Sequence, residues 1–215
     1  SGFENHAFFE ASSIRKIGDT YYFIYSSSAN HELCYATSKY PNREFRYGGV
    51  IISNGDIGIK GRKGKDRVAV TGNNHGSIEC IHGEWYIFYH RHTHMSSNSR
   101  QGCAERIKIC ENGFIPQVKM TSCGLNQGAL AADGDYPAVI ACNLTDGKMP
   151  HIGNGVCRQK KPHIIHKQEE RIITQIQDHT LIGYKYFCLE GKTKLFVMTS
   201  VTGNGKFIVC IRQGD

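Results

Sequence analysis

The feature that most constrains this chain is an internal repeat of aromatic-rich hairpins. Residues 14–26 (IRKIGDTYYFIYS) and residues 78–90 (IECIHGEWYIFYH) align without gaps at an offset of 64 positions. Each copy consists of a strand-like run, a two-residue turn that contains glycine and a second, aromatic-rich run, which is the pattern of a β-hairpin. The matching positions are Ile14 and Ile78, Ile17 and Ile81, Tyr21 and Trp85, Tyr22 and Tyr86, and Tyr25 and Tyr89.

Further strand-like runs complete the repeated unit. Residues 33–37 and 49–52 lie between the two hairpins. Each unit is therefore predicted to be a four-stranded antiparallel sheet of about 60 residues. A third, looser hairpin is predicted over residues 105–115, with Asn112-Gly113 as its turn. Repeated four-stranded units with little helical pattern indicate an all-β chain built as a β-propeller.

The repeat also predicts where one acidic side chain points. In a propeller, the first strand of every blade lines the central axis, and the residues just before each hairpin converge there. The offset of 64 places Ala11 opposite His75, so we expect the adjacent Glu10 to meet His75 near the axis. Two phenylalanines precede Glu10. A dry, apolar setting would raise the pKa of this carboxyl, as a general acid near neutral pH requires, although such a glutamate can also be purely structural.

Composition excludes some classes of function. The chain has 215 residues and a net charge of +7, yet its densest basic run, residues 60–67, is glycine-rich and lacks interleaved aromatic residues. We therefore interpret this run as a solvated loop and expect no nucleic-acid partner. The sequence has no apolar run long enough to span a membrane, and we expect no membrane partner. Because the chain starts with serine and enters a strand pattern almost at once, we expect it to be a fragment.

Nine cysteines bear on the redox environment. No two of them are spaced as a CxxC pair, which argues against a zinc ribbon. Their odd number argues against a framework in which every cysteine is paired in a disulfide. We expect free thiols, several of them buried within apolar strands, at Cys80, Cys110, Cys188 and Cys210. This favours a bacterial cytoplasmic location, with secretion and disulfides as the alternative.

Three segments together resemble glycoside hydrolase family 43. The segment from Phe8 to Lys16, followed by Tyr21 to Ser27, looks like the general-acid segment of that family. The segment Gly72-Asn73-Asn74-His75-Gly76-Ser77-Ile78, followed by Trp85 to His90, is similar to its axial-histidine blade. Ser99 to Arg106 resembles its last blade, and the three segments come in the family's order and spacing over roughly residues 3–121.

The resemblance implies a fold and a site. The family is a five-bladed propeller that cleaves arabinose- and xylose-containing plant polysaccharides with inversion, so residues 1–121 would form the third to fifth blades. Glu10 would be the general acid. Arg100, His75 and Phe9 would bind substrate, and His75 could also hold a structural calcium ion through water. No other cofactor is implied, and arabinoxylan or xylo-oligosaccharides would be the substrates.

The same resemblance leaves the catalytic set incomplete. The family's general base and the aspartate that tunes the acid belong to the first two blades, which this chain would lack. An inverting enzyme needs a second carboxylate roughly 6.5–9.5 Å from the acid. We do not assign the role of general base to Asp19, Asp56 or Asp66, because all three fall in predicted turns or loops. We therefore expect that this polypeptide needs a missing N-terminal propeller segment, the alternative being a non-catalytic carbohydrate-binding fragment.

Other aromatic and imidazole groups could serve the site or the core. His90, His92 and His94 alternate along one strand and share a face. Their spacing of roughly 6.6 Å for alternate residues favours a rim of the sugar site over a zinc site. Trp85 and Tyr86 are expected to pack between blades, with stacking on sugar as the alternative.

The pattern changes near residue 122. Short strand-like runs with turn signals between them predict a truncated β-sandwich over residues 122–215, with a weaker resemblance to family 6 carbohydrate-binding modules. Tyr184 and Tyr186 are expected in its core, with stacking on sugar as the alternative. The predicted strands cover residues 136–144, 171–176, 180–187, 194–200 and 207–211.

Overall fold

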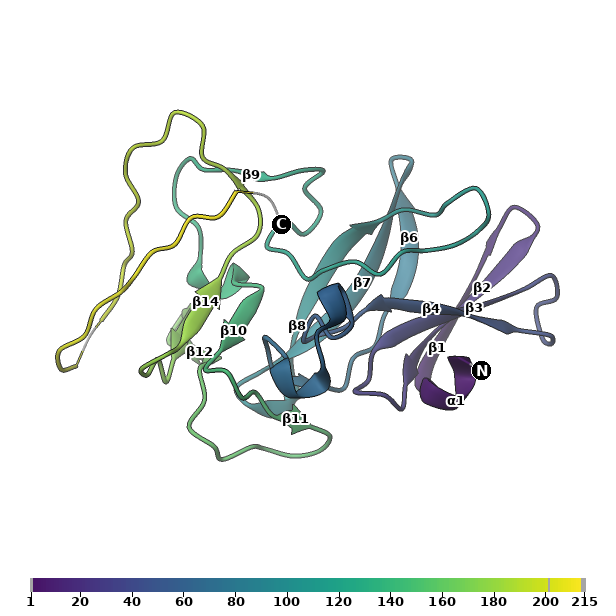
Figure 1. Ribbon diagram of the computed structural model, residues 1–215, viewed down its shortest axis with the longest axis horizontal. Helices are drawn as coiled ribbons and strands as arrows, with labels where there is room; N and C mark the ends of the chain where they lie inside the picture. Colours follow the sequence, from purple (N-terminus) through teal and green to yellow (C-terminus); the bar gives the residue numbers. More distant parts are fainter. Residues whose placement is uncertain (1, 201, 214–215) are drawn as a thin grey trace.

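The computed structural model describes residues 2–200 and 202–213 and is nearly all β, as predicted. Figure 1 shows two larger sheets beside one another and, on the far side of the second, a region of short strands and long loops. The only α-helix among the described residues is the single turn α1 (Gly2–Asn5), which packs beside the first sheet. None of the described helices has the length and apolar character needed to cross a membrane.

The first sheet confirms the predicted four-stranded unit. It is antiparallel, and its strands follow one another in chain order. The turn at Gly18-Asp19 joins the first two strands, and Gly18 has the positive φ of 55° that favours glycine in tight turns. The strands are β1 (Phe8–Ile17), β2 (Thr20–Ser27), β3 (Leu33–Ser38) and β4 (Arg46–Ile52).

The second sheet contains the second predicted hairpin. Its strands β6 (Ser77–Ile81), β7 (Glu84–Thr93) and β8 (Ser96–Ile107) are antiparallel and consecutive. The turn residues His82 and Gly83 both have positive φ, which matches the right-handed twist of the flanking strands. The segment that resembles the family's last blade is therefore the third strand of this sheet.

The third predicted hairpin forms only in part. Its turn at Asn112-Gly113 is present, with the Cys110 N–H donating to the Phe114 carbonyl at 2.9 Å, but no second strand follows it. After Ile107 the described chain has no strand until β9 (Leu130–Ala131), and residues 108–120 lie against the first sheet. There the Tyr22 hydroxyl donates to the carbonyl of Gly113 at 3.0 Å, and the Ile115 N–H donates to the Tyr35 hydroxyl at 2.9 Å. These tertiary hydrogen bonds hold the segment after the turn against the first sheet. The blade count stays a prediction.

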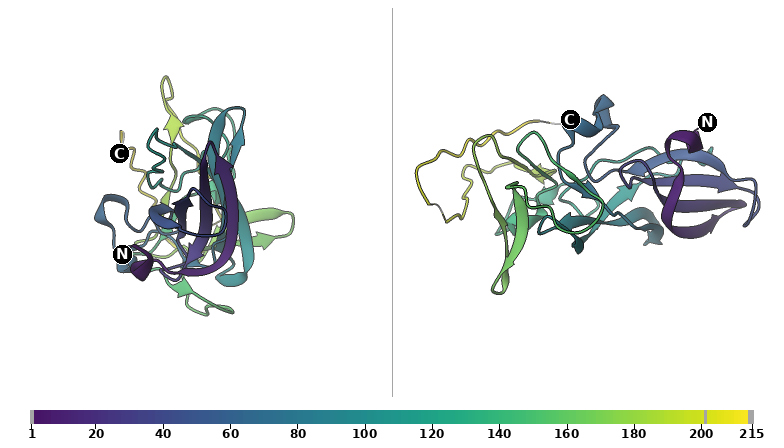
Figure 2. Two further views of the ribbon diagram at one scale, coloured as in Figure 1. Left: turned by 90° about the vertical axis from the view of Figure 1, so that its right-hand side faces the viewer. Right: turned by 90° about the horizontal axis from the view of Figure 1, so that it is seen from below.

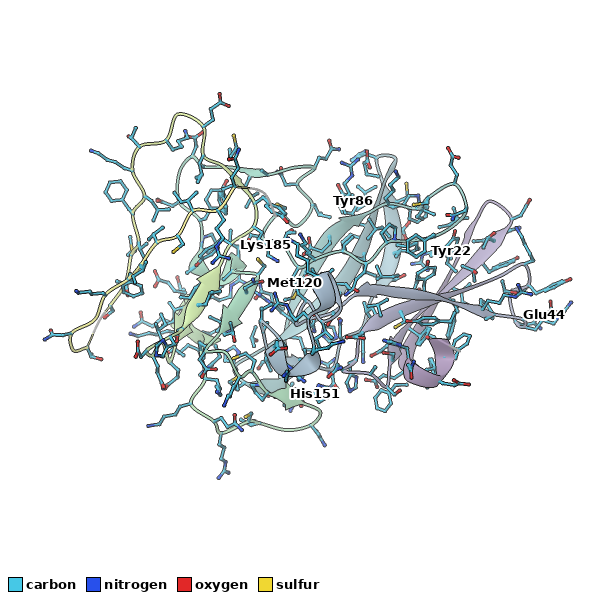
Figure 3. All side chains as sticks on the ribbon, in the orientation of Figure 1. Tyr22, Glu44, Tyr86, Met120, His151 and Lys185 are labelled. Atoms are coloured by element: carbon cyan, nitrogen blue, oxygen red, sulfur yellow. The ribbon has the colours of Figure 1, made fainter. Side chains whose placement is uncertain are left out.

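The main hydrophobic core lies between the two sheets. Ile24 and Ile51 of the first sheet and Ile78 and Ile87 of the second are fully buried in one cluster. Tyr22, which Figure 3 labels, belongs to the same cluster. Trp85 packs against this cluster, as predicted. Tyr86 is buried but is not part of the cluster, and its hydroxyl donates to the carbonyl of Leu125 at 3.3 Å. Figure 2 shows the two sheets side by side.

Residues 122–215 differ from the predicted sandwich in their strands. The described part contains short two-stranded ladders, and no strand forms over 194–200 or 207–211, where Met198 is fully exposed. Those two strand predictions are wrong, and Figures 1 and 2 show this tail as a long loop beyond the short strands. The strand predicted over 136–144 is also wrong for most of its length, since residues 138–140 form a 3-10 turn and only residues 143–145 form a strand. The assignment of 122–215 as a separate module stays a prediction. The strands are β10 (Asn143–Thr145), β11 (His151–Ile152), β12 (His163–Lys167), β13 (Glu170–Thr174), β14 (Leu181–Gly183) and β15 (Phe187–Cys188).

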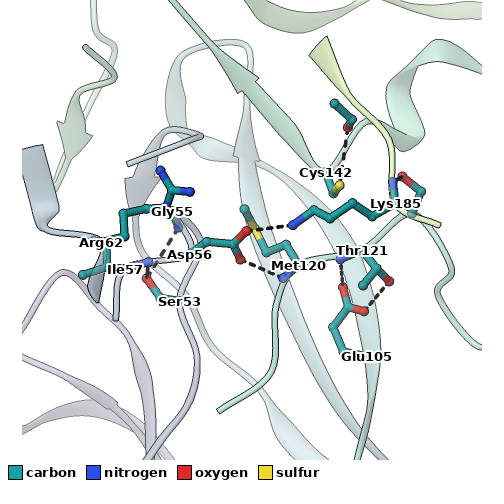
Figure 4. Close-up of polar contacts among 12 residues, drawn as sticks. Ser53, Gly55, Asp56, Ile57, Arg62, Glu105, Met120, Thr121, Cys142 and Lys185 are labelled. Atoms are coloured by element: carbon teal, nitrogen blue, oxygen red, sulfur yellow. Dashed lines mark hydrogen bonds and ion pairs between the residues drawn. The ribbon is translucent and has the colours of Figure 1, made fainter. Parts of the chain in front are cut away.

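The second half of the chain is tied to the sheets by buried polar contacts. The short strand β5 (Thr71–Gly72) pairs with β11 in parallel. The buried Arg91 guanidinium donates to the carbonyls of Ala141 and Val139 at 2.5 and 2.6 Å. Figure 4 shows Lys185 reaching the Asp56 carboxylate in the same region. Asp56 lies in a loop, as predicted, and its side chain is buried there as a structural residue.

Several side-chain predictions can be compared with the structure. All nine cysteines are free thiols, as predicted, but Cys80, Cys188 and Cys210 are exposed and their predicted burial is wrong. Tyr184 is 42% exposed and is not a core residue; its hydroxyl donates to the carbonyl of Ala138. The basic run 60–67 is a largely exposed loop with the 3-10 turns η1 (Ile59–Gly61) and η2 (Gly64–Asp66), and a third such turn, η3, spans Ala138–Ile140.

Candidate active site

Glu10 lies on β1 where the strand is irregular. The register of β1 against β2 shifts on both sides of Glu10, and the next residue, Ala11, has a φ of +58°. A bulge of this kind turns side chains away from the regular alternation of a strand, and bulges are frequent next to active sites. The Glu10 carboxylate consequently points toward the second sheet, where its Oε1 lies 2.8 Å from His75 Nε2. The predicted meeting of Glu10 and His75 is confirmed.

The environment of Glu10 differs from the predicted one. Its side chain is 38% exposed, and the rings of Phe8 and Phe9 are 53% and 54% exposed. Phe8 packs against Phe23 and Tyr25 on its own sheet, while Phe9 contacts the edge of the His31 ring. The predicted dry, apolar pocket is therefore wrong, because the bulge places the carboxylate among imidazoles and leaves both phenylalanines outside.

His75 is held from the second sheet. Its backbone N–H donates to His90 Nε2 at 3.1 Å, and the two rings meet edge to face at 5.2 Å. Because His90 Nε2 accepts this hydrogen bond, the neutral imidazole carries its proton on Nδ1. Burial, followed by the charge of Arg100 and neighbouring histidines, lowers the pKa of His90 to about 4. His90 is thus a neutral anchor that fixes the position of His75 at neutral pH.

Arg100 belongs to the same chain of polar contacts, but two residues separate it from the Glu10 carboxylate. Its Nη1 lies 3.5 Å from His90 Nε2, and its Nε donates to the carbonyl of Ser97 at 3.0 Å. Arg100 faces His92 across the β7–β8 ladder, where His90 pairs with Gly102. Arg100 therefore connects to Glu10 only through His90 and His75 among the contacts of the described residues.

Two further histidines that the sequence did not single out complete the cluster. His31 Nδ1 lies 3.8 Å from Glu10 Oε1, and the His31 ring stacks on His151 at 5.5 Å. His151 also contacts the Thr71 hydroxyl through Nδ1 at 3.1 Å. Burial lowers the pKa of both His31 and His151. No local spacing signals this pair, because His31 follows the first hairpin and His151 comes from the second half of the chain.

The alternating histidines of β7 do not form one group. His90 and His92 lie on the strand, whereas His94 sits in the turn after it with a φ of +56° and contacts His166 instead. His92 is 4% exposed, and neither of its ring nitrogens has a hydrogen-bond partner in the structure. Burial, and then the charge of Arg100, lowers the pKa of His92 to about 4.

The described residues do not fit a directly bound metal ion. No group of three or more His, Cys, Asp or Glu side chains among them is arranged to hold one. Calcium prefers six to eight oxygen ligands, whereas His75 is surrounded by imidazoles and the single carboxylate of Glu10. Calcium held through water, which the resemblance implied for His75, stays a prediction.

A second carboxylate does not contact Glu10 in the part of the chain that the structure describes. Asp19 occupies the β1–β2 turn and Asp66 the exposed η2 turn. Asp56 is engaged by Lys185 and by the N–H of Met120. The nearby sequence does contain a buried acid, Glu32, whose carboxylate contacts His6 Nε2 at 3.2 Å, and burial raises its pKa to about 7.

Comparison with known proteins finds relatives described as xylosidases and arabinosidases. No protein-family model matches it. It is 52% identical over 200 residues to a xylosidase/arabinosidase of Thermoclostridium stercorarium, covering 89% of this chain and 42% of that protein. It is 38% identical over 85 residues to a beta-xylosidase of Xylanibacter ruminicola, covering 40% of this chain and 22% of that protein.

Solved structures give a partial match. A glycoside hydrolase family 43 enzyme of Xanthomonas citri, crystallised with xylose, matches with 25% identity and a TM-score of 0.40, over 53% of this chain and 30% of that one. The chain spans less than half the length of the curated relatives that it matches. Over nearly all of its own length, it is similar to a protein described as a xylosidase/arabinosidase.

Proposed function

We propose that this chain is the acid-bearing part of a family 43 glycoside hydrolase that removes terminal arabinose or xylose from plant hemicellulose with inversion. The observation that carries the proposal is the 2.8 Å contact between Glu10 and His75, which come from two sheets related by the internal repeat. The 52% identity to a xylosidase/arabinosidase supports the same assignment. Arabinoxylan and xylo-oligosaccharides are the proposed substrates.

In this proposal, Glu10 protonates the oxygen of the departing sugar. His75 Nε2 accepts a hydrogen bond from the protonated carboxyl, or donates one to the carboxylate, and so holds Oε1 in place through either state. The His75 backbone is fixed in turn by neutral His90. His75, Arg100 and the exposed Phe9 ring are the proposed substrate contacts, with Phe9 offering an apolar face to the sugar.

The general base is proposed to come from polypeptide outside these residues. An inverting mechanism needs a second carboxylate that activates water on the opposite face of the sugar. The described residues bring no other carboxylate into contact with Glu10, and the Thermoclostridium stercorarium relative is more than twice as long as the region matched. The same observation favours a second candidate, in which this chain by itself binds carbohydrate without cleaving it.

The test compares two kinds of substrate in the complete gene product. Glu10→Gln should reduce kcat/KM on xylobiose about 10³-fold, because a poor leaving group needs protonation, whereas an activated aryl xyloside should lose less than tenfold. Glu44→Gln is the matched control, since Glu44 lies at the outer tip of the first sheet (Figure 3) and should leave both rates unchanged. An equal loss of kcat/KM on both substrates would show that Glu10 is not the general acid. If the wild type binds xylo-oligosaccharides but does not cleave them, the second candidate function holds.

A further inference from the structure

A polar hollow of about 410 Å³ lies between the second sheet and the hairpin formed by β12 and β13. This volume is within the range of small-molecule sites, which is roughly 300–1,000 Å³. The β7–β8 ladder supplies one wall and the hairpin supplies the other. Its lining residues are Thr93, Arg100, Gln101, Gly102, Ile164, His166 and Arg171.

The charged side chains that line the hollow are positive. Two guanidinium groups, those of Arg100 and Arg171, face the hollow, and the lining contains no carboxylate. In the described part of the chain, no ion pair or hydrogen bond engages the Arg171 side chain. Arg100 uses its Nε on the Ser97 carbonyl and one terminal nitrogen on His90, which leaves its other terminal nitrogen available. Guanidinium groups bind carboxylates in a forked, two-bond geometry, so the lining suits an anionic ligand.

The hollow is continuous with the candidate active site through side-chain contacts. Arg100 contacts His90, His90 accepts from the His75 backbone, and His75 contacts Glu10. These contacts therefore connect a ligand bound to Arg100 with the residues around Glu10. The Thr93 hydroxyl and the Gln101 amide in the lining can hydrogen-bond to sugar hydroxyl groups.

We propose that this hollow binds the carboxylate of a uronic-acid unit carried by the same polysaccharide chain that reaches Glu10. Arg171 forms the principal ion pair with that carboxylate, and Arg100 links the hollow to the histidine cluster. The inference rests on the proposed function for its substrate class, and it adds a preference for acidic over neutral hemicellulose. Sulfate, phosphate and small carboxylic acids carry a negative charge but have no sugar ring. Contacts between the lining and the sugar ring would therefore distinguish a uronic-acid unit from these small anions.

The experiment measures affinity, which does not depend on a complete catalytic set. Isothermal titration of this chain uses a glucuronic-acid-substituted xylo-oligosaccharide, the unsubstituted oligosaccharide of equal length, and sodium acetate. The acidic oligosaccharide should bind about fivefold more tightly than the neutral one, and acetate should bind far more weakly than either. Arg171→Gln should abolish the fivefold preference without changing the affinity for the neutral oligosaccharide.

Two variants on the same hairpin act as controls. Lys167→Gln removes an equal charge from β12 at an exposed residue outside the hollow, and it should leave the preference intact. Arg171→Lys keeps the charge but not the fork and should retain part of the preference. Equal affinity of the wild type for acidic and neutral oligosaccharides, or equal losses in the Arg171 and Lys167 variants, overturns the inference. Loss of all neutral binding with retained, Arg171-dependent glucuronate binding overturns the proposed function instead and leaves the anionic site standing.

Discussion

The hydroxyl oxygens of Ser13 and Ser77 lie 2.8 Å apart, although the two residues are separated by 64 positions in the chain. This separation is the repeat offset itself, so equivalent positions of the two hairpins touch. Arg15 and Glu79 are related by the same offset, and their side chains form an ion pair at 3.4 Å. The first strands of the two sheets therefore run side by side in repeat register, which is what brings Glu10 and His75 together.

The first prediction tests that register by cross-linking. The double substitution Ser13→Cys/Ser77→Cys should form a disulfide on mild oxidation, because the two oxygens are already in contact and a small rotamer change brings sulfur atoms to bonding distance. Peptide mapping by mass spectrometry under non-reducing conditions detects the linked strands among the nine native thiols. Ser12→Cys/Ser77→Cys is the control, since Ser12 is exposed and neighbouring strand residues point to opposite faces. Cross-linking of the control in equal yield contradicts the register.

The second prediction concerns the ion pair that joins the two halves of the chain. Lys185 Nζ lies 2.9 Å from Asp56 Oδ2, and the Asp56 side chain is only 3% exposed (Figure 4). Lys185→Met leaves a buried carboxylate with the Met120 N–H as its remaining donor, so the free energy of unfolding should fall by about 2–3 kcal/mol. Urea unfolding followed by circular dichroism measures this loss.

Two further variants show whether the loss comes from an unpaired charge. Asp56→Asn combined with Lys185→Met removes both charges while the asparagine carbonyl still accepts from Met120, so the double variant should be more stable than Lys185→Met alone. Lys192→Met breaks an exposed pair with Asp133 and should change stability by less than about 0.5 kcal/mol. A double variant as unstable as Lys185→Met would mean that packing, rather than charge, holds this junction.

How far the sequence predicted this structure depended on whether the decisive interactions were local. The hairpins formed as expected because alternation and turn residues lie within one short segment, and the repeat offset placed Glu10 near His75. The turn at Gly113 was predicted correctly, but the strand after it was not, because the hydroxyls of Tyr22 and Tyr35 hold this segment against the first sheet. His31 and His151 join the site from 120 positions apart, a proximity that no local pattern encodes.

The third prediction uses the buried carboxyl of Glu105. Burial raises its pKa to about 7 despite hydrogen bonds from the Tyr89 hydroxyl and from the N–H and hydroxyl of Thr121. Between pH 4.5 and 7 the native state therefore binds more protons than the unfolded state, and its stability falls as pH rises through that window. Glu105→Gln should reduce the loss of unfolding free energy between pH 4.5 and 8 by about 2–3 kcal/mol.

The control for Glu105 is an exposed glutamate. Glu79→Gln on β6 changes a residue whose carboxylate is half exposed and forms only a surface ion pair, so it should leave the pH dependence of stability unchanged. Urea unfolding at pH 4.5 and pH 8 is measured for the wild type and both variants. A Glu105→Gln protein with the same pH dependence as the wild type would show that its hydrogen bonds outweigh the cost of burial.

The last prediction concerns His92, whose pH dependence has the opposite sign. Because its pKa is lowered to about 4, the native state binds fewer protons than the unfolded state between pH 4 and 6.5, and stability is lost as pH falls through that window. His92→Leu removes this titration and two buried nitrogens without partners, so it should reduce the acid-induced loss of unfolding free energy by about 2 kcal/mol. The exposed His179→Gln is the control. A variant that loses stability below pH 6.5 as steeply as the wild type would place the acid sensitivity elsewhere, with His90 as the next residue to substitute because its pKa is lowered to the same value.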